Sequence, residues 1–297
     1  MRRLATLAVA ASLMLAAPIA RAADAGCPEG GINYGVIPYD SSASFRPLYR
    51  RIGEIIGAAL GCPVNVRVGS SYTATIEAMR AHKVDAAEFG PLSYVLAHEV
   101  AKAEAVATYA DREGKPDTYT ASIVTWPGSG VTTLKAVEGR TFAYSDPAST
   151  SGHLFPAYGL SKAGIDPDRG IKPVYAGSHT ASFEALRNHK VQAGELNSPE
   201  ISSATGAGIY KASDFVVLWT SDPIPQDPIT VRGDLGEPLK TRLAQVLAHL
   251  DLSAVPAKER AVIGLKGDGL VPQTDAAYDG IRDLVSVLHL DLKKMNE

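Results

Sequence analysis

The sequence has little of what marks several common functional classes. It holds 2 cysteines in 297 residues, too few for a metal centre built from thiolates. Its 29 basic residues are outnumbered by 32 acidic ones, so the positive footprint of a nucleic-acid-binding protein is missing. Beyond its N-terminal stretch it has no apolar run long enough to cross a membrane. We therefore expect no metal, no cofactor, no nucleic-acid partner and no membrane insertion.

Residues 1–22 have the pattern of a cleavable signal peptide. Two arginines precede an apolar run over 4–17, and 20–22 is a small-x-small cleavage sequence. A membrane anchor is the alternative, but the run is short for a span. A lipoprotein is disfavoured because Cys27 follows Asp-Ala-Gly, which is not a small apolar box. We expect a soluble mature chain that begins near residue 23 and is located in the periplasm.

The two cysteines, Cys27 and Cys62, have two interpretations. An oxidising compartment after export permits a disulfide between them, which would tie the N-terminal tail to the first half of the chain. Two free thiols are the alternative. The length of the mature chain fits two domains.

One stretch of the sequence occurs twice. Residues 72–90 read YTATIEAMRAHKVDAAEFG, and residues 179–197 read HTASFEALRNHKVQAGELN. Each copy predicts a helix, a tight turn and a short buried strand. Each strand contains a carboxylate, Glu88 in the first copy and Glu195 in the second, and burying a carboxylate without a partner costs several kcal/mol. We therefore expect two similar lobes whose copies face one cleft, with Tyr72 and His179 beginning the helices there.

The order of the remaining elements predicts an α/β fold. A strand over 32–37, a helix over 45–60 and a strand over 64–68 precede the first copy, which is the order of a parallel sheet with crossover helices. The loop after the first strand begins with Tyr39, at a strand end where open α/β sheets bind ligands. We expect residues 31–123 and 222–297 to form lobe I, and 124–221 to form lobe II.

Three hydroxyl residues, Ser149, Thr150 and Ser151, precede a helix expected over 153–163. Free N–H groups, the positive end of the helix dipole and the hydroxyls would then point at one place, which favours an anion site. The alternative is an ordinary helix cap, because Ser and Thr begin many helices.

The chain resembles the phosphate/phosphite/phosphonate-binding family of periplasmic solute-binding proteins, which serve ABC importers. The resemblance covers nearly the whole mature chain and rests on five segments in order: Tyr72–Met79, Val84–Tyr94, Asp146–Gly152, Gly177–His179 and Ile224–Pro228. It implies a bilobal fold that closes on its ligand at the cleft, with an inner-membrane permease and its ATPase as partners. No enzymatic activity is expected, and we expect a monomer.

The resemblance also implies roles for single residues. Ser149, Thr150 and Ser151 match the oxyanion-binding helix start, and His179 matches an anion-contacting histidine. Asp227 matches a carboxylate that holds the amino group in binders of aminoalkylphosphonates. Thr180 and Phe89 depart from the residue types common in the family.

The acidic residues suggest which ligand is bound. Glu88, Glu195 and Asp227 beside an anion pocket make sense if the ligand also carries a cation. We therefore expect an aminoalkylphosphonate, with 2-aminoethylphosphonate as the leading candidate and phosphite or phosphate as the alternative. A periplasmic sensor subunit is a further alternative. A hydrolase using Ser149, His179 and Asp227 is less favoured, because Ser149 lies in no Gly-x-Ser-x-Gly elbow.

Overall fold

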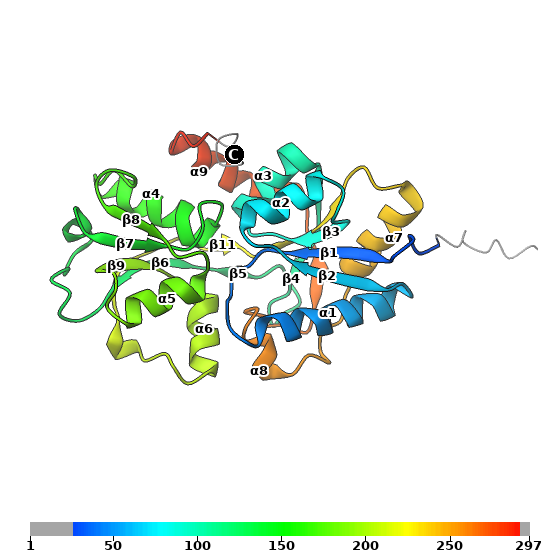
Figure 1. Cartoon of the computed structure of the whole chain (residues 1–297), viewed down its shortest axis with the longest axis horizontal. Helices are drawn as coiled ribbons and strands as arrows, with labels where there is room; N and C mark the ends of the chain where they lie inside the picture. The colour runs from blue at the N-terminus through cyan, green and yellow to red at the C-terminus, as the bar shows by residue number, and fades with distance from the viewer. Residues whose placement is uncertain (1–25, 292–297) are drawn as a thin grey trace, which may run out of the picture.

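A computed structural model describes residues 26–291 of the chain. It has two α/β lobes side by side, each built around its own sheet (Figure 1). The expected signal peptide lies outside the described residues. Among those residues, no helix is both long and apolar enough to span a membrane.

Lobe I contains a six-stranded sheet in the order β13-β4-β12-β3-β1-β2. β1 pairs in parallel with β2 and β3, as the alternating order of strands and helices predicted, whereas β12 runs antiparallel to both neighbours. The strands are β1 (Ile32–Val36), β2 (Val64–Val68), β3 (Ala86–Glu88), β4 (Ala103–Tyr109), β12 (Pro228–Arg232) and β13 (Leu270–Pro272). The helices are α1 (Phe45–Leu60), α2 (Tyr72–Arg80), α3 (Pro91–Ala101), α7 (Glu237–Leu247), α8 (Ala257–Arg260) and α9 (Asp279–Val287).

Helix α1 shows why these residues form an element that packs on the sheet. Leu48, Ile52 and Ile56 recur at helical spacing and are buried on its inner face. The helix ends at Gly61, which has φ 64° and accepts the left-handed conformation without a Cβ clash.

Lobe II contains a five-stranded sheet in the order β10-β6-β9-β7-β8. The strands are β6 (Ala121–Thr125), β7 (Thr141–Tyr144), β8 (Lys172–Tyr175), β9 (Ala193–Asn197) and β10 (Val216–Thr220). The helices are α4 (Phe155–Lys162), α5 (His179–Arg187) and α6 (Ser198–Gly206). The boundary expected at 123 falls inside β6, whose partners are β9 and β10 of this sheet. The chain therefore enters lobe II a few residues earlier, because the pairing partners of a strand cannot be read from its own residues.

The repeated stretch folds twice in the same way. α2 with β3, and α5 with β9, are each a helix, a turn and a strand. Ser71 and Ser178 are the N-cap residues, and each accepts a hydrogen bond from the N–H three residues later. His82 and His189 both take the left-handed conformation, with φ 57° and 56°. The duplicated sequence thus encodes a duplicated backbone, down to the residue that turns each helix into its strand.

The lobes are joined by two crossings and also pack against each other. β5 (Thr118–Tyr119) and β11 (Ile224–Pro225) pair as a short antiparallel ribbon between the two sheets (Figure 1). One buried cluster contains Ala148 and Leu154 of lobe II together with Ile37 and Tyr72 of lobe I. The structure is therefore a closed form, with the cleft covered on both sides.

The helix expected over 153–163 begins differently in the structure. Residues Thr150–Leu154 form one wide π-helical turn, which leads into α4 at Phe155. Such turns are often found at functional sites, and here it brings three hydroxyl residues into the cleft.

Cys27 and Cys62 form the expected disulfide, with an S–S distance of 2.13 Å. It links the segment before β1 to the turn between α1 and β2, so the N-terminal segment is covalently attached to lobe I.

We predict that the Cys27→Ser, Cys62→Ser double variant loses about 3–4 kcal/mol of unfolding free energy, because the disulfide restricts the unfolded chain. Urea unfolding of the oxidised wild type and the double variant measures the difference. Wild type under reducing conditions is the matched control and should behave like the variant. Equal stability of all three samples would contradict the prediction.

Candidate functional site

A cavity lies between the lobes where the two copies of the repeat meet. Tyr72 and His179, which begin α2 and α5, both line it, as expected from their matching positions. Of the residues singled out in the sequence, only Glu195 does not line it. The full lining is Ile37, Tyr39, Tyr72, Glu88, Gly90, Tyr109, Tyr119, Ser149, Thr150, Ser151, His179, Asn197, Pro199, Gln226, Asp227 and Ile263.

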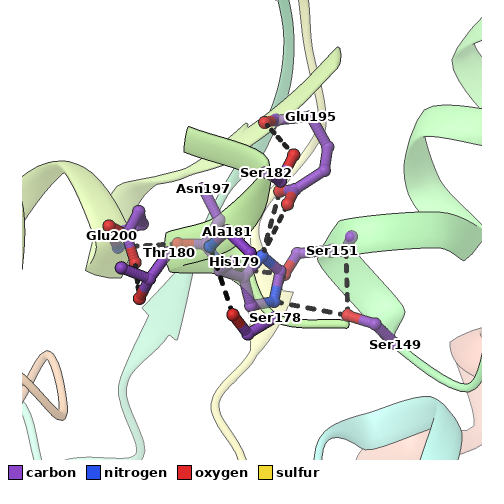
Figure 2. Close-up of polar contacts among 11 residues, drawn as sticks. Ser149, Ser151, Ser178, His179, Thr180, Ala181, Ser182, Glu195, Asn197 and Glu200 are labelled. Carbon is purple, nitrogen blue, oxygen red and sulfur yellow. Dashed lines mark hydrogen bonds and ion pairs between the residues drawn. The ribbon is translucent and has the colours of Figure 1, made fainter. Parts of the chain in front are cut away.

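One side of the cavity is rich in hydrogen-bond donors. Ser149 caps the π-helical turn, and its Oγ accepts from the Gly152 N–H at 3.0 Å. Within residues 26–291, no acceptor is bonded to the N–H groups of Thr150 and Ser151. His179 Nε2 lies 3.3 Å from Ser149 Oγ and 3.5 Å from Ser151 Oγ (Figure 2). Free backbone donors, hydroxyls and a ring N–H gathered at one point are suited to a tetrahedral oxyanion.

The imidazole of His179 is held from behind by Glu195. Its Nδ1 lies 3.0 Å from both carboxylate oxygens, and both side chains are buried (Figure 2). Burial alone would lower the pKa of His179, but the charge and hydrogen bond of Glu195 outweigh it, so the pKa is raised. A protonated ring donates at both nitrogens, so Nε2–H faces the cavity as a charged donor.

This chain of side chains has the order of a hydrolytic triad, with a different acid from the one expected. Glu195, not Asp227, contacts the histidine opposite Ser149. A triad needs a neutral imidazole to take the serine proton. The same pairing with a carboxylate also suits a histidine that donates to an anion, because a raised pKa increases the fraction of rings that carry a proton on Nε2.

Glu88 contacts tyrosines at the lobe I side of the cavity. Its two carboxylate oxygens accept from the hydroxyls of Tyr49 at 2.7 Å and Tyr109 at 2.8 Å. The Tyr39 hydroxyl lies 2.7 Å from that of Tyr49, so the network reaches the expected cleft residue Tyr39. Burial raises the pKa of Glu88 to about 7, against the opposing effect of the two tyrosine hydrogen bonds. Both oxygens of Glu88 therefore have protein partners.

Asp227 is in a different position from the two glutamates. It lies between β11 and β12, is half-buried, and lines the cavity. No residue in the described range 26–291 donates a hydrogen bond to its carboxylate. Burial, and then the charge of Glu88, raise the pKa of Asp227 well above its usual value, while His179 opposes the shift. A half-buried acid that lines a cavity and has no protein donor is a group that a ligand can satisfy.

Helix N-termini at the cleft are also capped across it. Thr150 Oγ1 of lobe II accepts from the Leu92 N–H of α3 at 2.8 Å, and α3 has a glycine N-cap with no side chain of its own. In return, the His179 N–H of α5 donates to the Tyr39 carbonyl of lobe I at 2.9 Å. These bonds exist only when the lobes are together, so they stabilise the closed cleft.

Four polar residues that line the cavity were not identified as functional from the sequence: Tyr109, which donates to Glu88, and Tyr119, Asn197 and Gln226. Tyr119 lines the cavity together with Thr150 and Ser151, and Asn197 Nδ2 donates to Ser151 Oγ at 3.0 Å. Gln226 precedes Asp227 in the proline-rich link. Asn197 ends the strand of the second copy, a position that could have suggested it. Tyr119 and Gln226 carry no such signal, because their roles depend on the pairing of β5 with β11.

The fold and the cavity together define the class of the protein. Two α/β lobes, joined by two crossings and closed over an anion-suited cavity, are the architecture of a bilobal periplasmic solute-binding protein. No group of three or more potential metal ligands occurs in residues 26–291.

Comparison with known proteins gives the family. The model of the family described as "ABC transporter, phosphonate, periplasmic substrate-binding protein" matches residues 34–278. The chain therefore belongs to the family of periplasmic phosphonate-binding proteins of ABC transporters. It is 28% identical over 279 residues to the phosphate-import protein PhnD of Mycolicibacterium smegmatis, covering 88% of this chain and 87% of that protein. It is 29% identical over 220 residues to the phosphonates-binding periplasmic protein of Escherichia coli, covering 72% of this chain and 64% of that protein.

Solved structures agree with the fold. A binding protein component of an ABC phosphonate transporter from Pseudomonas aeruginosa superposes with a TM-score of 0.76 at 25% identity, covering 90% of this chain and 88% of that one. PhnD1 of Prochlorococcus marinus in complex with methylphosphonate superposes with a TM-score of 0.74 at 20% identity, covering 87% and 98%.

We predict that Glu195→Gln weakens oxyanion binding near neutral pH by about 1–3 kcal/mol, the usual range for a hydrogen bond involving a charged group. Without the carboxylate, burial lowers the pKa of His179, so the charged donor is lost at a lower pH. Calorimetric titration of wild type and variant across pH gives the ratio of their dissociation constants, in which the titration of the ligand itself cancels. The matched control is Glu184→Gln on α5, whose half-buried carboxylate pairs with Arg187 and does not line the cavity. A ratio near one at every pH would contradict the prediction.

We predict that Thr150→Val weakens ligand binding mainly by speeding dissociation, because it removes the cap on α3 that exists only in the closed form. The expected loss is about 1–2 kcal/mol, as for other helix N-caps. Thr150→Ser retains the hydroxyl and should restore most of the binding. Stopped-flow dissociation rates measure the effect, and equal rates for the Val and Ser variants would refute the capping role.

Proposed function

We propose that this protein captures a phosphonate between its lobes in the periplasm and delivers it, as a monomer, to an inner-membrane permease driven by an ATPase. The phosphonate oxygens would be bound by the backbone N–H groups and hydroxyls of Ser149, Thr150 and Ser151. The Nε2–H of His179 and the hydroxyl of Tyr72 would complete the shell. The backbone N–H groups and hydroxyls carry no net charge, and Glu195 balances the charge of the His179 imidazolium. The donor side of the empty site is therefore close to neutral.

We further propose that the ligand is an aminoalkylphosphonate, with 2-aminoethylphosphonate as the leading candidate. The observation that supports it is the Asp227 carboxylate, which is half-buried, opens into the cavity and lacks a protein donor among residues 26–291. An ammonium group would donate charge-assisted hydrogen bonds to it and offset the cost of its burial. Glu88 and Glu195 add less than their sequence positions suggested, because tyrosines and His179 already bond them.

Phosphate or phosphite is the second candidate. It is favoured by the fact that Glu88 and Glu195 already have protein partners and so do not face the ligand as free negative charges. With a single available carboxylate, the site can also recognise an oxyanion that keeps one proton, since Asp227 could accept from its P–OH group. Related proteins carry names for phosphate, phosphonate and phosphite binding, so the family spans these chemistries.

Calorimetry of the purified protein with 2-aminoethylphosphonate, methylphosphonate, phosphite and phosphate tests the proposal. We expect 2-aminoethylphosphonate to bind most tightly. Asp227→Asn should reduce its affinity by about 1–3 kcal/mol while leaving methylphosphonate nearly unchanged, because only the amino compound gives a charge-assisted bond there.

Tighter binding of methylphosphonate, phosphite or phosphate would overturn the assignment of the amino compound. If Asp227→Asn weakens phosphate selectively, Asp227 recognises a P–OH group and the second candidate is correct. The Asp222→Asn variant, an exposed acid before β11, is the matched control for loss of one negative charge in the same link.

A further inference from the structure

A second cavity lies directly behind the ligand cavity at the seam of the lobes. Three pairs of consecutive residues form the wall between the two cavities. Tyr39, His179 and Pro199 line the ligand cavity, and the next residues, Asp40, Thr180 and Glu200, line the second one. The second cavity has a volume of about 160 Å³. A hydrogen bond from the His179 N–H to the Tyr39 carbonyl joins two of these three pairs, so the wall between the cavities is also a contact between the lobes.

Two buried carboxylates from opposite lobes face this seam cavity. Asp40 follows β1 in lobe I, Glu200 lies on α6 in lobe II, and their side chains are 5% and 6% exposed. Thr180 connects the two sides. Its Oγ1 donates to Glu200 Oε2 at 3.3 Å (Figure 2), and it accepts from the Ser41 N–H of lobe I at 3.4 Å. Closing the lobes therefore buries two like charges together, which is unfavourable while both remain ionised.

The surrounding charged groups do not neutralise this pair. Lys258 and Glu259 of α8 line the same cavity, but Glu259 is bound to Arg51 at 3.1 Å. Lys258 is exposed and forms no ion pair with either carboxylate among residues 26–291. His179 also acts on Glu200, but it is already paired with Glu195, whose own charge opposes its effect.

We propose that Asp40 and Glu200 form a proton-operated latch on the cleft, in which the lobes close most firmly when Glu200 holds a proton and loosen when both carboxylates are ionised. The latch acts on closure and lies outside the oxyanion shell, so it goes beyond the proposed function and does not depend on which phosphorus compound is bound.

The direction of the pH dependence follows from the closed form. Burial, and then the charge of Asp40, raise the pKa of Glu200 to about 7. In the open form water reaches this carboxyl, and an unperturbed glutamate titrates at about pH 4.3. The closed form thus binds more protons, so closure is favoured at low pH. The equilibrium constant for closure falls by about tenfold per pH unit between the pKa of Glu200 in the open form and its pKa in the closed form. Above the closed-form pKa it is constant.

The test compares wild type with Glu200→Gln, which keeps an acceptor for Thr180 but cannot ionise. We expect the ratio of dissociation constants for 2-aminoethylphosphonate, wild type over variant, to rise by up to about tenfold per unit between about pH 5 and about pH 7. The titration of the ligand cancels in this ratio. The exposed Glu99→Gln of α3 should show a constant ratio. In Asp40→Asn the negative charge that helps to raise the pKa of Glu200 is removed. The rise in the ratio of dissociation constants should therefore end at a lower pH.

Small-angle scattering of the ligand-free protein makes the test independent of the ligand. We expect the radius of gyration of wild type to increase over the same pH range, and that of Glu200→Gln to stay constant. This result would support the latch even if no phosphonate binds, so failure of the latch and failure of the proposed function are distinguishable. Parallel pH curves for wild type and Glu200→Gln in both measurements would overturn the proposal, as would an unchanged pH range in Asp40→Asn.

Discussion

The buried pair of His179 and Glu195 is the interaction on which the cleft depends. An oxyanion enclosed between two lobes needs hydrogen-bond donors. The charge of a buried charged donor must be balanced by another charge when the site holds no ligand. Glu195 does this for His179 from behind, while Nε2 remains directed at the hydroxyls of Ser149 and Ser151. The strand that carries Glu195 and the helix that begins with His179 belong to one copy of the repeat. A single helix–turn–strand unit therefore supplies both the donor and its counter-charge.

Comparison of the two copies indicates how much the sequence could predict. The repeat alone predicted two helix–turn–strand units, and the structure has both, with matching serine caps and matching left-handed histidines. The equivalent glutamates, however, have different partners. Glu195 bonds the histidine of its own copy, whereas Glu88 bonds Tyr49 of α1 and Tyr109 of β4. The first copy begins with Tyr72 in place of a histidine, so its glutamate is satisfied by residues distant in sequence, which no local pattern reveals.

The position of Ser149, Thr150 and Ser151 at the cleft was also predictable, but the contact that each side chain makes was not. All three hydroxyl residues line the cavity, yet Thr150 Oγ1 accepts the N–H of Leu92 from the opposite lobe. That contact requires the glycine N-cap of α3, some sixty residues earlier in the chain, and the relative placement of two lobes. Local sequence specifies a helix start, whereas tertiary packing decides whether its groups face a ligand, another helix or both.

The acids of this protein illustrate why burial, not position, decides what a carboxylate does. Glu88, Glu195, Glu200 and Asp227 all lie at the cleft or its seam, and all carry a cost of desolvation. Glu88 accepts hydrogen bonds from two tyrosines, and Glu195 is paired with the imidazole of His179. Glu200 accepts from one hydroxyl and faces the carboxylate of Asp40. Its pKa is therefore raised, because protonation removes the cost of burying its charge. Asp227 has neither a protein donor among residues 26–291 nor a full cover of protein atoms, and it opens into the cavity. The cost of desolvation is thus offset by protein donors at Glu88 and Glu195, is expressed as a raised pKa at Glu200, and is reduced by exposure to the cavity at Asp227.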